Sequence, residues 1–216
     1  MDTIDLDAFA RVPVSRDPFE HIVVSGFVPG QVAAAARAGF PDIGCGGLIP
    51  VSGSGYGEGF MRLIEALRSE SMRQAFEAKF GVALDPRSLL VTMRGRCRRY
   101  DGQIHTDSES KVVTALVYLD DDWRADGGRL RLLRSADDIE DVVAEVPPGP
   151  GTLVAFRRSD NSFHGHKPYE GVRRVVMLNW MVDARAAGRE RRRHALSAGI
   201  KRLAPAAFDT RAGLLS

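Results

Sequence analysis

The sequence predicts a single α+β domain whose core is a jelly roll, that is, a double-stranded β-helix barrel. Three observations predict this fold class. Helix-periodic segments occupy the first half of the 216 residues, β-favouring apolar segments separated by turn signals occupy the second half, and no repeat, low-complexity tract or long linker divides the chain. Several short antiparallel strands close well as a jelly roll, the architecture of cupin-type barrels, whose interior can hold a site.

The first half predicts one strand and a set of supporting helices. An apolar strand at His21–Val24 precedes a helix from Pro29 to about Ala38, and the Gly-rich residues 44–58 form a loop. A helix near Glu58–Arg68 follows, because its apolar residues recur at the spacing of one buried face: Phe60, Leu63, Ile64 and Leu67. A further helix over Ser71–Phe80 ends at a glycine, which is a common helix stop.

The second half predicts five strands of the barrel and a final helix. The strands are apolar and β-favouring, and they lie at Leu89–Met93, Val112–Leu119, Leu130–Leu133, Gly151–Phe156 and Val175–Trp180. Glycine-containing turns separate several of them, as at Asp101-Gly102 and Pro147–Gly151. We therefore expect one domain over residues 1–216, with a barrel core at about 89–183 and a basic helical extension at about 184–204, before Pro205.

The basic extension has two interpretations. Residues 185–202 carry seven Lys and Arg residues against a single acid, Glu190. Such a run is typical of a solvated helix face, and it could also bind phosphates or an anionic membrane surface. Because the run lies outside the barrel, we do not expect nucleic acid to be the partner of this protein.

Composition excludes several classes of protein. With 44% hydrophobic and 27% charged residues, the chain resembles an ordinary globular protein, and its net charge of +2 points to no particular partner. No stretch approaches the roughly 18 unbroken apolar residues of a membrane helix, so we expect no membrane insertion. The acidic start, Met1–Asp7, lacks the features of a signal peptide, and Cys45 and Cys97 do not form a disulfide framework. We therefore expect a cytoplasmic protein.

Two histidine-bearing segments predict a metal site. His105 and Asp107 are alternate residues of an extended segment, so both side chains can reach one ion while Thr106 points elsewhere. About sixty positions later, a polar loop after a predicted strand reaches His164 and His166. Two imidazoles and one carboxylate form the three-ligand face that mononuclear non-haem Fe(II) uses, with open positions for a cosubstrate and oxygen.

An arginine follows the second segment at the start of an apolar strand. Arg173 and Arg174 both precede Val175–Trp180. An arginine that opens an inward-facing strand suggests a buried carboxylate partner, because the guanidinium matches carboxylate geometry in a two-pronged way. A ligand carboxylate would supply that partner.

Taken in order, these segments resemble the 2-oxoglutarate/Fe(II) oxygenases, and within them the prolyl-4-hydroxylase-like group. The matching segments span about residues 89–183: Tyr100-Asp101-Gly102 with His105-Thr106-Asp107, Thr114–Trp123 as a T-x-x-x-Y-L-N-x-x-W strand, Gly127–Leu132 as a G-G-x-L-x-L strand, and Phe156, His164, Pro168 and Arg174 at the family spacing. Asp120 stands where this pattern has asparagine.

The resemblance implies a set of roles. His105, Asp107 and His164 would bind Fe(II), and Arg174, with the Tyr118 hydroxyl, would bind the distal carboxylate of 2-oxoglutarate. Trp180 would help to wall the cosubstrate pocket, since Arg174 and Trp180 share a face of their strand. The implied activity is hydroxylation of an unactivated C–H bond, with O2 consumed, succinate and CO2 released, and ascorbate as a candidate reductant. The substrate would be a protein side chain such as proline, a small metabolite or a glycan.

Three alternatives stay open. His166 could replace His164 as a ligand, and Arg173 could replace Arg174, although the spacing to Pro168 and Trp180 favours His164 and Arg174 and leaves Arg173 facing outward. The protein could instead be a cupin-like metal protein without oxygenase chemistry, such as an isomerase or a sugar-binding module. Before the metal motif, strand alternation places three basic side chains on one face, either at the entrance to the site or on a solvated surface: Arg94, Arg96 and Arg98.

Overall fold

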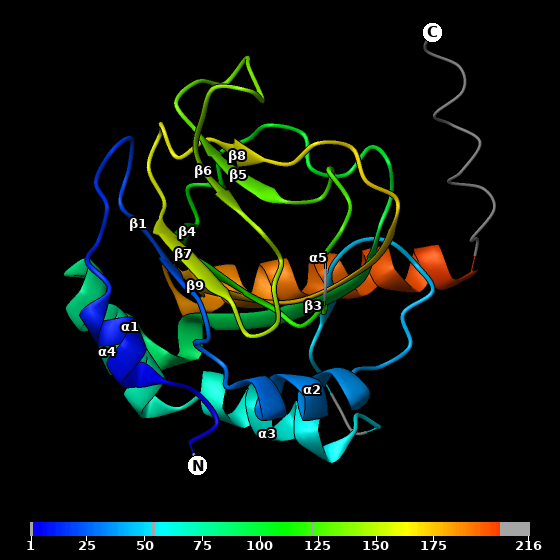
Figure 1. Ribbon diagram of the computed structural model, residues 1–216. Helices are drawn as coiled ribbons and strands as arrows, with labels where there is room; N and C mark the ends of the chain where they lie inside the picture. Colours follow the sequence, from blue (N-terminus) through cyan, green and yellow to red (C-terminus); the bar gives the residue numbers. More distant parts are fainter. Residues whose placement is uncertain (1, 53–54, 122, 204–216) are drawn as a thin grey trace, which may run out of the picture.

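The molecule is built in layers (Figure 1). The computed structural model describes residues 2–52, 55–121 and 123–203. Four helices lie below a six-stranded sheet, and a three-stranded sheet lies above it (Figure 1). The helices are α1 (Leu6–Arg11), α2 (Gly30–Ala38), α3 (Glu58–Leu67) and α4 (Glu70–Phe80). The predicted helices of the first half are therefore confirmed, and α1 was not predicted.

The strands form the two sheets of a jelly roll. The larger sheet has the order β1-β7-β4-β9-β3-β2, and its strands are β1 (His21–Val24), β2 (Ile49–Pro50), β3 (Leu89–Cys97), β4 (Lys111–Tyr118), β7 (Leu153–Arg157) and β9 (Gly171–Met181). The smaller sheet has the order β6-β5-β8, with β5 (Leu130–Leu133), β6 (Val142–Val146) and β8 (His164–Gly165). Its strands pair antiparallel, as do those of the larger sheet. The double-stranded β-helix expected from the sequence is confirmed.

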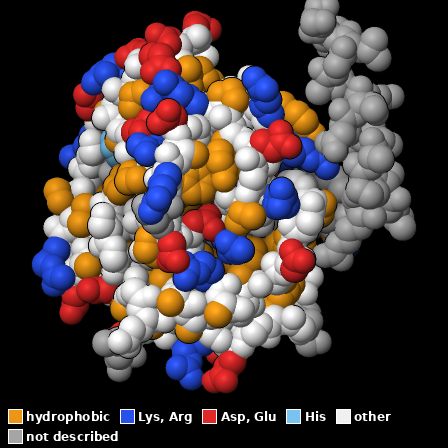
Figure 2. Space-filling view, turned by 45° about the vertical axis from the view of Figure 1, so that its right-hand side comes forward, with side chains coloured by type: hydrophobic (Ala, Val, Ile, Leu, Met, Phe, Trp, Pro, Cys, Tyr) orange, Lys and Arg blue, Asp and Glu red, His pale blue; other side chains and the backbone are white. Residues whose placement is uncertain are grey.

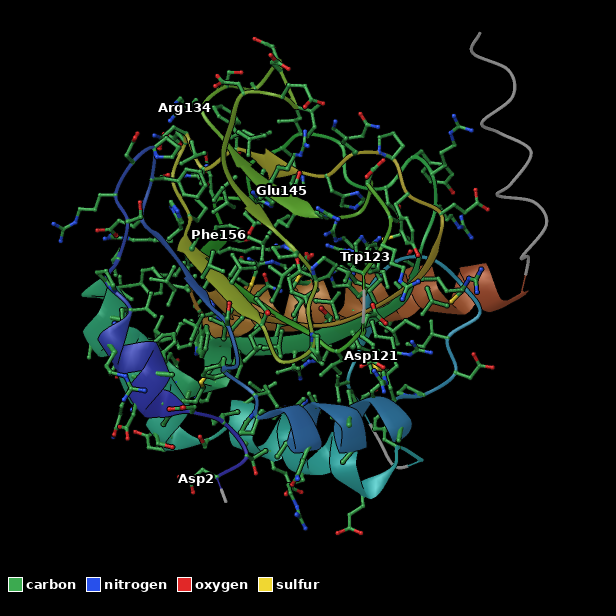
Figure 3. The ribbon with its side chains drawn as sticks, in the orientation of Figure 1. Asp2, Asp121, Trp123, Arg134, Glu145 and Phe156 are labelled. Carbon is green, nitrogen blue, oxygen red and sulfur yellow. The ribbon has the colours of Figure 1, made fainter. Side chains whose placement is uncertain are left out.

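Two apolar layers flank the larger sheet. On the helix side, Phe60 and Phe76 pack with residues of β3, β4 and β9, including Trp180. Between the sheets, a smaller cluster contains Tyr118, Phe156 and Leu132. Phe156, labelled in Figure 3, lies on β7 beneath the upper strands. Both faces of the central strands are thus buried. Hydrophobicity therefore does not show which face of β9 is directed at the smaller sheet.

The last helix, α5 (Ala184–Leu203), packs against β2, β3, β9 and the short 3₁₀ helix η1 (Pro86–Ser88). This confirms the predicted helix; residue 204 and Pro205 lie outside the described residues. Among the described residues, no helix combines the length and apolarity that a membrane crossing requires. On the face drawn in Figure 2, basic and acidic side chains are interspersed and do not form one continuous basic field.

Candidate metal centre and active site

A backbone bridge between His105 and His164 brings the two histidine-bearing segments together. The N–H of His105 donates to the carbonyl of His164 at 3.1 Å, and the N–H of His164 donates to the carbonyl of His105 at 3.0 Å. The two imidazole rings lie 4.4 Å apart between centroids. Because His164 belongs to β8, which pairs with β5, the bridge places both rings at the edge of the smaller sheet.

Three side chains converge there in an arrangement that suits a metal ion. Ligand atoms of His105, Asp107 and His164 all lie within 4.8 Å of one another. Nδ1 of His105 is 2.8 Å from the carbonyl of Gln103, and Nδ1 of His164 is 2.9 Å from the carbonyl of Ser162. A carbonyl can only accept, so each Nδ1 carries the proton and each Nε2 keeps its lone pair for a metal. The donor set therefore fits Fe(II).

Asp107 is buried and held as a carboxylate. The ammonium of Lys111 donates to Oδ1 at 2.6 Å, and the hydroxyl of Thr114 donates to Oδ2 at 2.5 Å. Burial alone would raise its pKa, but the charge of Lys111, the electrostatic interaction with the neighbouring His164 and these two hydrogen bonds hold the pKa of Asp107 below its usual value. The oxygen atoms of Asp107 are therefore available as anionic ligands at neutral pH.

His164 is held neutral. Burial is the main cause that lowers the pKa of His164 to about 4. His105 and Lys111 also lower it, and the charge of Asp107 raises it but does not outweigh burial. A neutral imidazole is the form that binds a metal, so the site has no proton to displace from this ring near pH 7.

His166 lies beside the metal-ligand candidates but outside their cluster. It lines the same cavity, and its Nδ1 is 2.8 Å from the carbonyl of Lys167. Burial and the charge of Arg173 lower the pKa of His166 to about 4. The three-residue cluster contains His164 and not His166, which supports the choice made from spacing.

The two arginines at the start of β9 face opposite sides of the sheet, and their expected orientation is reversed. Arg173 is 3% exposed and lines the cavity with His105, Asp107 and His164. Its Nε donates to the carbonyl of Gly128 at 2.9 Å, and its Nη2 donates to the Tyr118 hydroxyl at 3.3 Å. Arg174 instead forms an ion pair with Asp120 at 3.1 Å, at a separate hollow.

Alternation along β9 explains the reversal. Val175 and Met177 continue the face of Arg173 and pack between the sheets, whereas Val176 and Trp180 continue the face of Arg174 and pack on the helix side. Strand alternation in the sequence correctly predicts which residues of β9 share a face. Because both faces of the strand are apolar, hydrophobicity did not show which set faces the site.

Trp180 consequently lies away from the candidate site. Its ring packs 4.6 Å from Phe76 of α4, in the helix-side core. The expectation that it walls a cosubstrate pocket is not supported by this placement. Tyr118 lies between the sheets, with its ring 5.3 Å from the Arg173 guanidinium, so its arginine neighbour is Arg173 and not the expected Arg174.

The cavity at this site has a volume of about 150 Å³. A cavity of this size has room for several water molecules or one small ligand. Its walls come from both sheets and from the loop before β2, and they include Leu48, Arg94, Lys111, Thr114, Leu116, Leu130 and Met177. The sequence did not single out Lys111, Thr114 or the buried Asn179 as site residues, although polar residues in apolar strands are a usable signal.

The three arginines before the metal motif do not share a face. Arg94 is directed to the cavity and pairs with Asp101 at 2.5 Å, whereas Arg96 is exposed beside Arg174. A β-bulge between Arg94 and Arg96, opposite Arg173 and Arg174 of β9, breaks the alternation. Only Arg94 of the three lines this cavity.

The comparison with protein families found a match over the part of the chain that contains the site. The model of the 2OG-Fe(II) oxygenase superfamily matches residues 95–182, a stretch that contains the three clustered ligands, Tyr118 and both arginines. This stretch of the chain is therefore similar to the 2OG-Fe(II) oxygenase superfamily. The match supports a hydroxylating dioxygenase that uses Fe(II) and 2-oxoglutarate, with O2 as the second cosubstrate. Among curated proteins, none matches its sequence.

Solved structures share the fold of this chain. A prolyl-4-hydroxylase from Pseudomonas putida is similar with a TM-score of 0.54 and 19% identity, over 82% of this chain and 92% of the other. A prolyl 4-hydroxylase from Phytophthora capsici gives a TM-score of 0.57 and 17% identity over 83% and 66%. A prolyl hydroxylase from Trichoplax adhaerens, solved with a hypoxia inducible factor peptide fragment, gives 0.53 and 14% over 85% and 91%. At these identities the likeness establishes the fold.

Proposed function

We propose that His105, Asp107 and His164 are the Fe(II) ligands of this oxygenase. The convergence of their ligand atoms within 4.8 Å is the observation that carries the proposal. The Nδ1 hydrogen bonds to backbone carbonyls fix both rings, so each Nε2 can bind without reorientation. Thr114 fixes the carboxylate of Asp107, and Asn179 lies 3.0 Å from the Thr114 hydroxyl.

We further propose Arg173, with Tyr118, as the site for the distal carboxylate of 2-oxoglutarate. Arg173 replaces Arg174 in this role because it alone of the two lines the cavity. A guanidinium has five N–H donors, and those not directed at Gly128 and Tyr118 can bind a carboxylate. A buried arginine in this position also favours the oxygenase over a cupin-like isomerase or sugar-binding module.

The reaction expected is R–H + O2 + 2-oxoglutarate → R–OH + succinate + CO2. Bound iron and 2-oxoglutarate supply the oxidising chemistry. The chain's own residues orient the ligands, bind the cosubstrate carboxylate and exclude water. Apolar side chains on the inner faces of the sheets, Leu116, Leu130 and Met177, wall the cavity.

Prolyl side chains are the first substrates to test. Structures that share the fold include prolyl hydroxylases, and the small cavity leaves the bulk of a peptide outside the barrel. A small metabolite or glycan is the alternative.

We also propose that residues 89–183 form the barrel of one domain with the helices around it. The two free cysteines, Cys45 and Cys97, support a cytoplasmic location.

The proposed activity can be tested without knowing the substrate. Purified protein with Fe(II), 2-oxoglutarate and O2 is incubated with host peptide and metabolite extracts, and succinate release and the gain of one oxygen atom are followed by mass spectrometry. We expect both with the wild-type protein and neither with D107A. Equal succinate release by the two proteins would contradict the assignment of Asp107.

A further inference from the structure

Both oxygen atoms of the candidate ligand Asp107 are already engaged. Lys111 donates to Oδ1 at 2.6 Å and Thr114 donates to Oδ2 at 2.5 Å. The Lys111–Asp107 pair is also well shielded, with side-chain exposures of 14% and 5%. The ammonium group therefore neutralises a buried carboxylate at the position where a metal ion would do the same.

The two partners of Asp107 differ in how easily they can move. Thr114 lies in the middle of β4, is 2% exposed, and its hydroxyl is also 3.0 Å from Asn179 on β9. A β-branched side chain in a packed strand has little rotamer freedom. Lys111 is the first residue of β4 and ends in a flexible four-carbon stem. A cation that binds Oδ1 would repel the ammonium, so Lys111 is the partner that gives way.

A second acid lies within the electrostatic range of Lys111. Lys111 pairs across the strands with Met181 at the end of β9, and Met181 packs against Ala186 and Ala187 of α5. On the same helix, Glu190 is 18% exposed and contacts Arg193 and His194. Partial burial raises the pKa of Glu190, but Arg193, His194 and, more weakly, Lys111 hold it below the usual value.

We propose that Lys111 is a displaceable counter-ion of the metal site. In the metal-free protein it neutralises Asp107, and when a divalent metal binds it moves toward Glu190 of α5. The basic C-terminal helix would then be coupled to metal loading, which gives Glu190, the single acid of residues 185–202, a function. This inference rests on the proposed metal site.

The test is a double-mutant cycle on metal affinity, measured with Mn(II) alone by titration calorimetry at constant pH and low salt. K111M removes the competing cation and its repulsion of the metal ion, so we expect Mn(II) to bind about tenfold more tightly. E190Q removes the second position of Lys111, so we expect about threefold weaker binding in the Lys111 background and no change in the K111M background. K111Q serves as a second variant if K111M does not fold.

Two controls separate the possible explanations. E140Q removes an exposed acid that pairs with Lys167 and Arg131, away from Asp107, and should leave Mn(II) affinity unchanged. T114V removes the fixed donor to Asp107 and should weaken Mn(II) binding, opposite in sign to K111M.

Two results would overturn the proposal. Weaker Mn(II) binding by both K111M and K111Q would mean that Lys111 supports the metal-bound state. An equal effect of E190Q in both backgrounds would exclude Glu190 as the second partner. These outcomes are distinct from failure of the metal site itself, which would appear as unchanged Mn(II) affinity in H164A.

Discussion

The guanidinium of Arg173 donates to the hydroxyl of Tyr118 at 3.3 Å, across neighbouring strands and 55 positions of sequence. Both groups are buried between the sheets, on the side of the candidate metal site. Because an arginine and a hydroxyl together offer several donors, this pair is suited to binding a carboxylate.

The pair predicts that the two adjacent arginines differ in function. R173A should raise the Kd for 2-oxoglutarate by about 10- to 100-fold, because a charge-assisted contact to the carboxylate is lost. R174A should change it by less than about threefold, since the partly exposed Arg174 is paired with Asp120 and lines a separate hollow. The measurement is an anaerobic titration of the Fe(II)-loaded protein with 2-oxoglutarate. A larger effect for R174A would contradict the orientation seen on β9.

We expect a substitution of Trp180 to change the stability of the protein and not its affinity for 2-oxoglutarate. W180L should lower the free energy of unfolding by about 2–4 kcal/mol, because the ring is 1% exposed and packs on Phe76. The Kd for 2-oxoglutarate should be nearly unchanged, because the ring lies on the helix side of the sheet. Urea unfolding and the same titration check both values. A large loss of cosubstrate affinity with little loss of stability would contradict this placement.

The sequence predicts a helix or strand reliably only where its hydrophobic pattern fits one type of secondary structure. The long helix-periodic and β-favouring segments were found because one period dominates each of them. By contrast, β2 and β8 have two residues each, too few for any period to show. The bridge that joins His105 to His164 is a long-range contact and has no local signal at all.

The errors at the site have a common physical cause. A strand buried on both faces shows which residues share a face but not which face meets the site, so Arg174 and Trp180 were placed together and on the wrong side. The β-bulge beside Gly95 then separated Arg94 from Arg96. Lys111 and Thr114 act at the site through their contacts with Asp107, four and seven positions away. A polar residue in an apolar strand can be noticed in the sequence, but no local pattern shows which carboxylate it contacts.

The metal-free protein should lose stability as the pH falls from about 6.5 toward 4. His164 and His166 have pKa values lowered to about 4 in the folded state by burial. The unfolded chain therefore binds protons first, near the ordinary value of about 6.5, and each ring contributes on the order of 3 kcal/mol to the loss. H166Q should show a smaller decline than the wild-type protein in urea unfolding at pH 7.5 and pH 4.5. Equal declines would show that His166 is not held neutral.

The central claim, that His105, Asp107 and His164 hold Fe(II) for a 2-oxoglutarate-dependent reaction, is tested most directly by anaerobic visible spectroscopy. Fe(II) and 2-oxoglutarate added together should give a weak charge-transfer band in the wild-type protein. The band should be absent in H105A and H164A and retained in H166A. A band that survives in H164A and disappears in H166A would contradict the assignment.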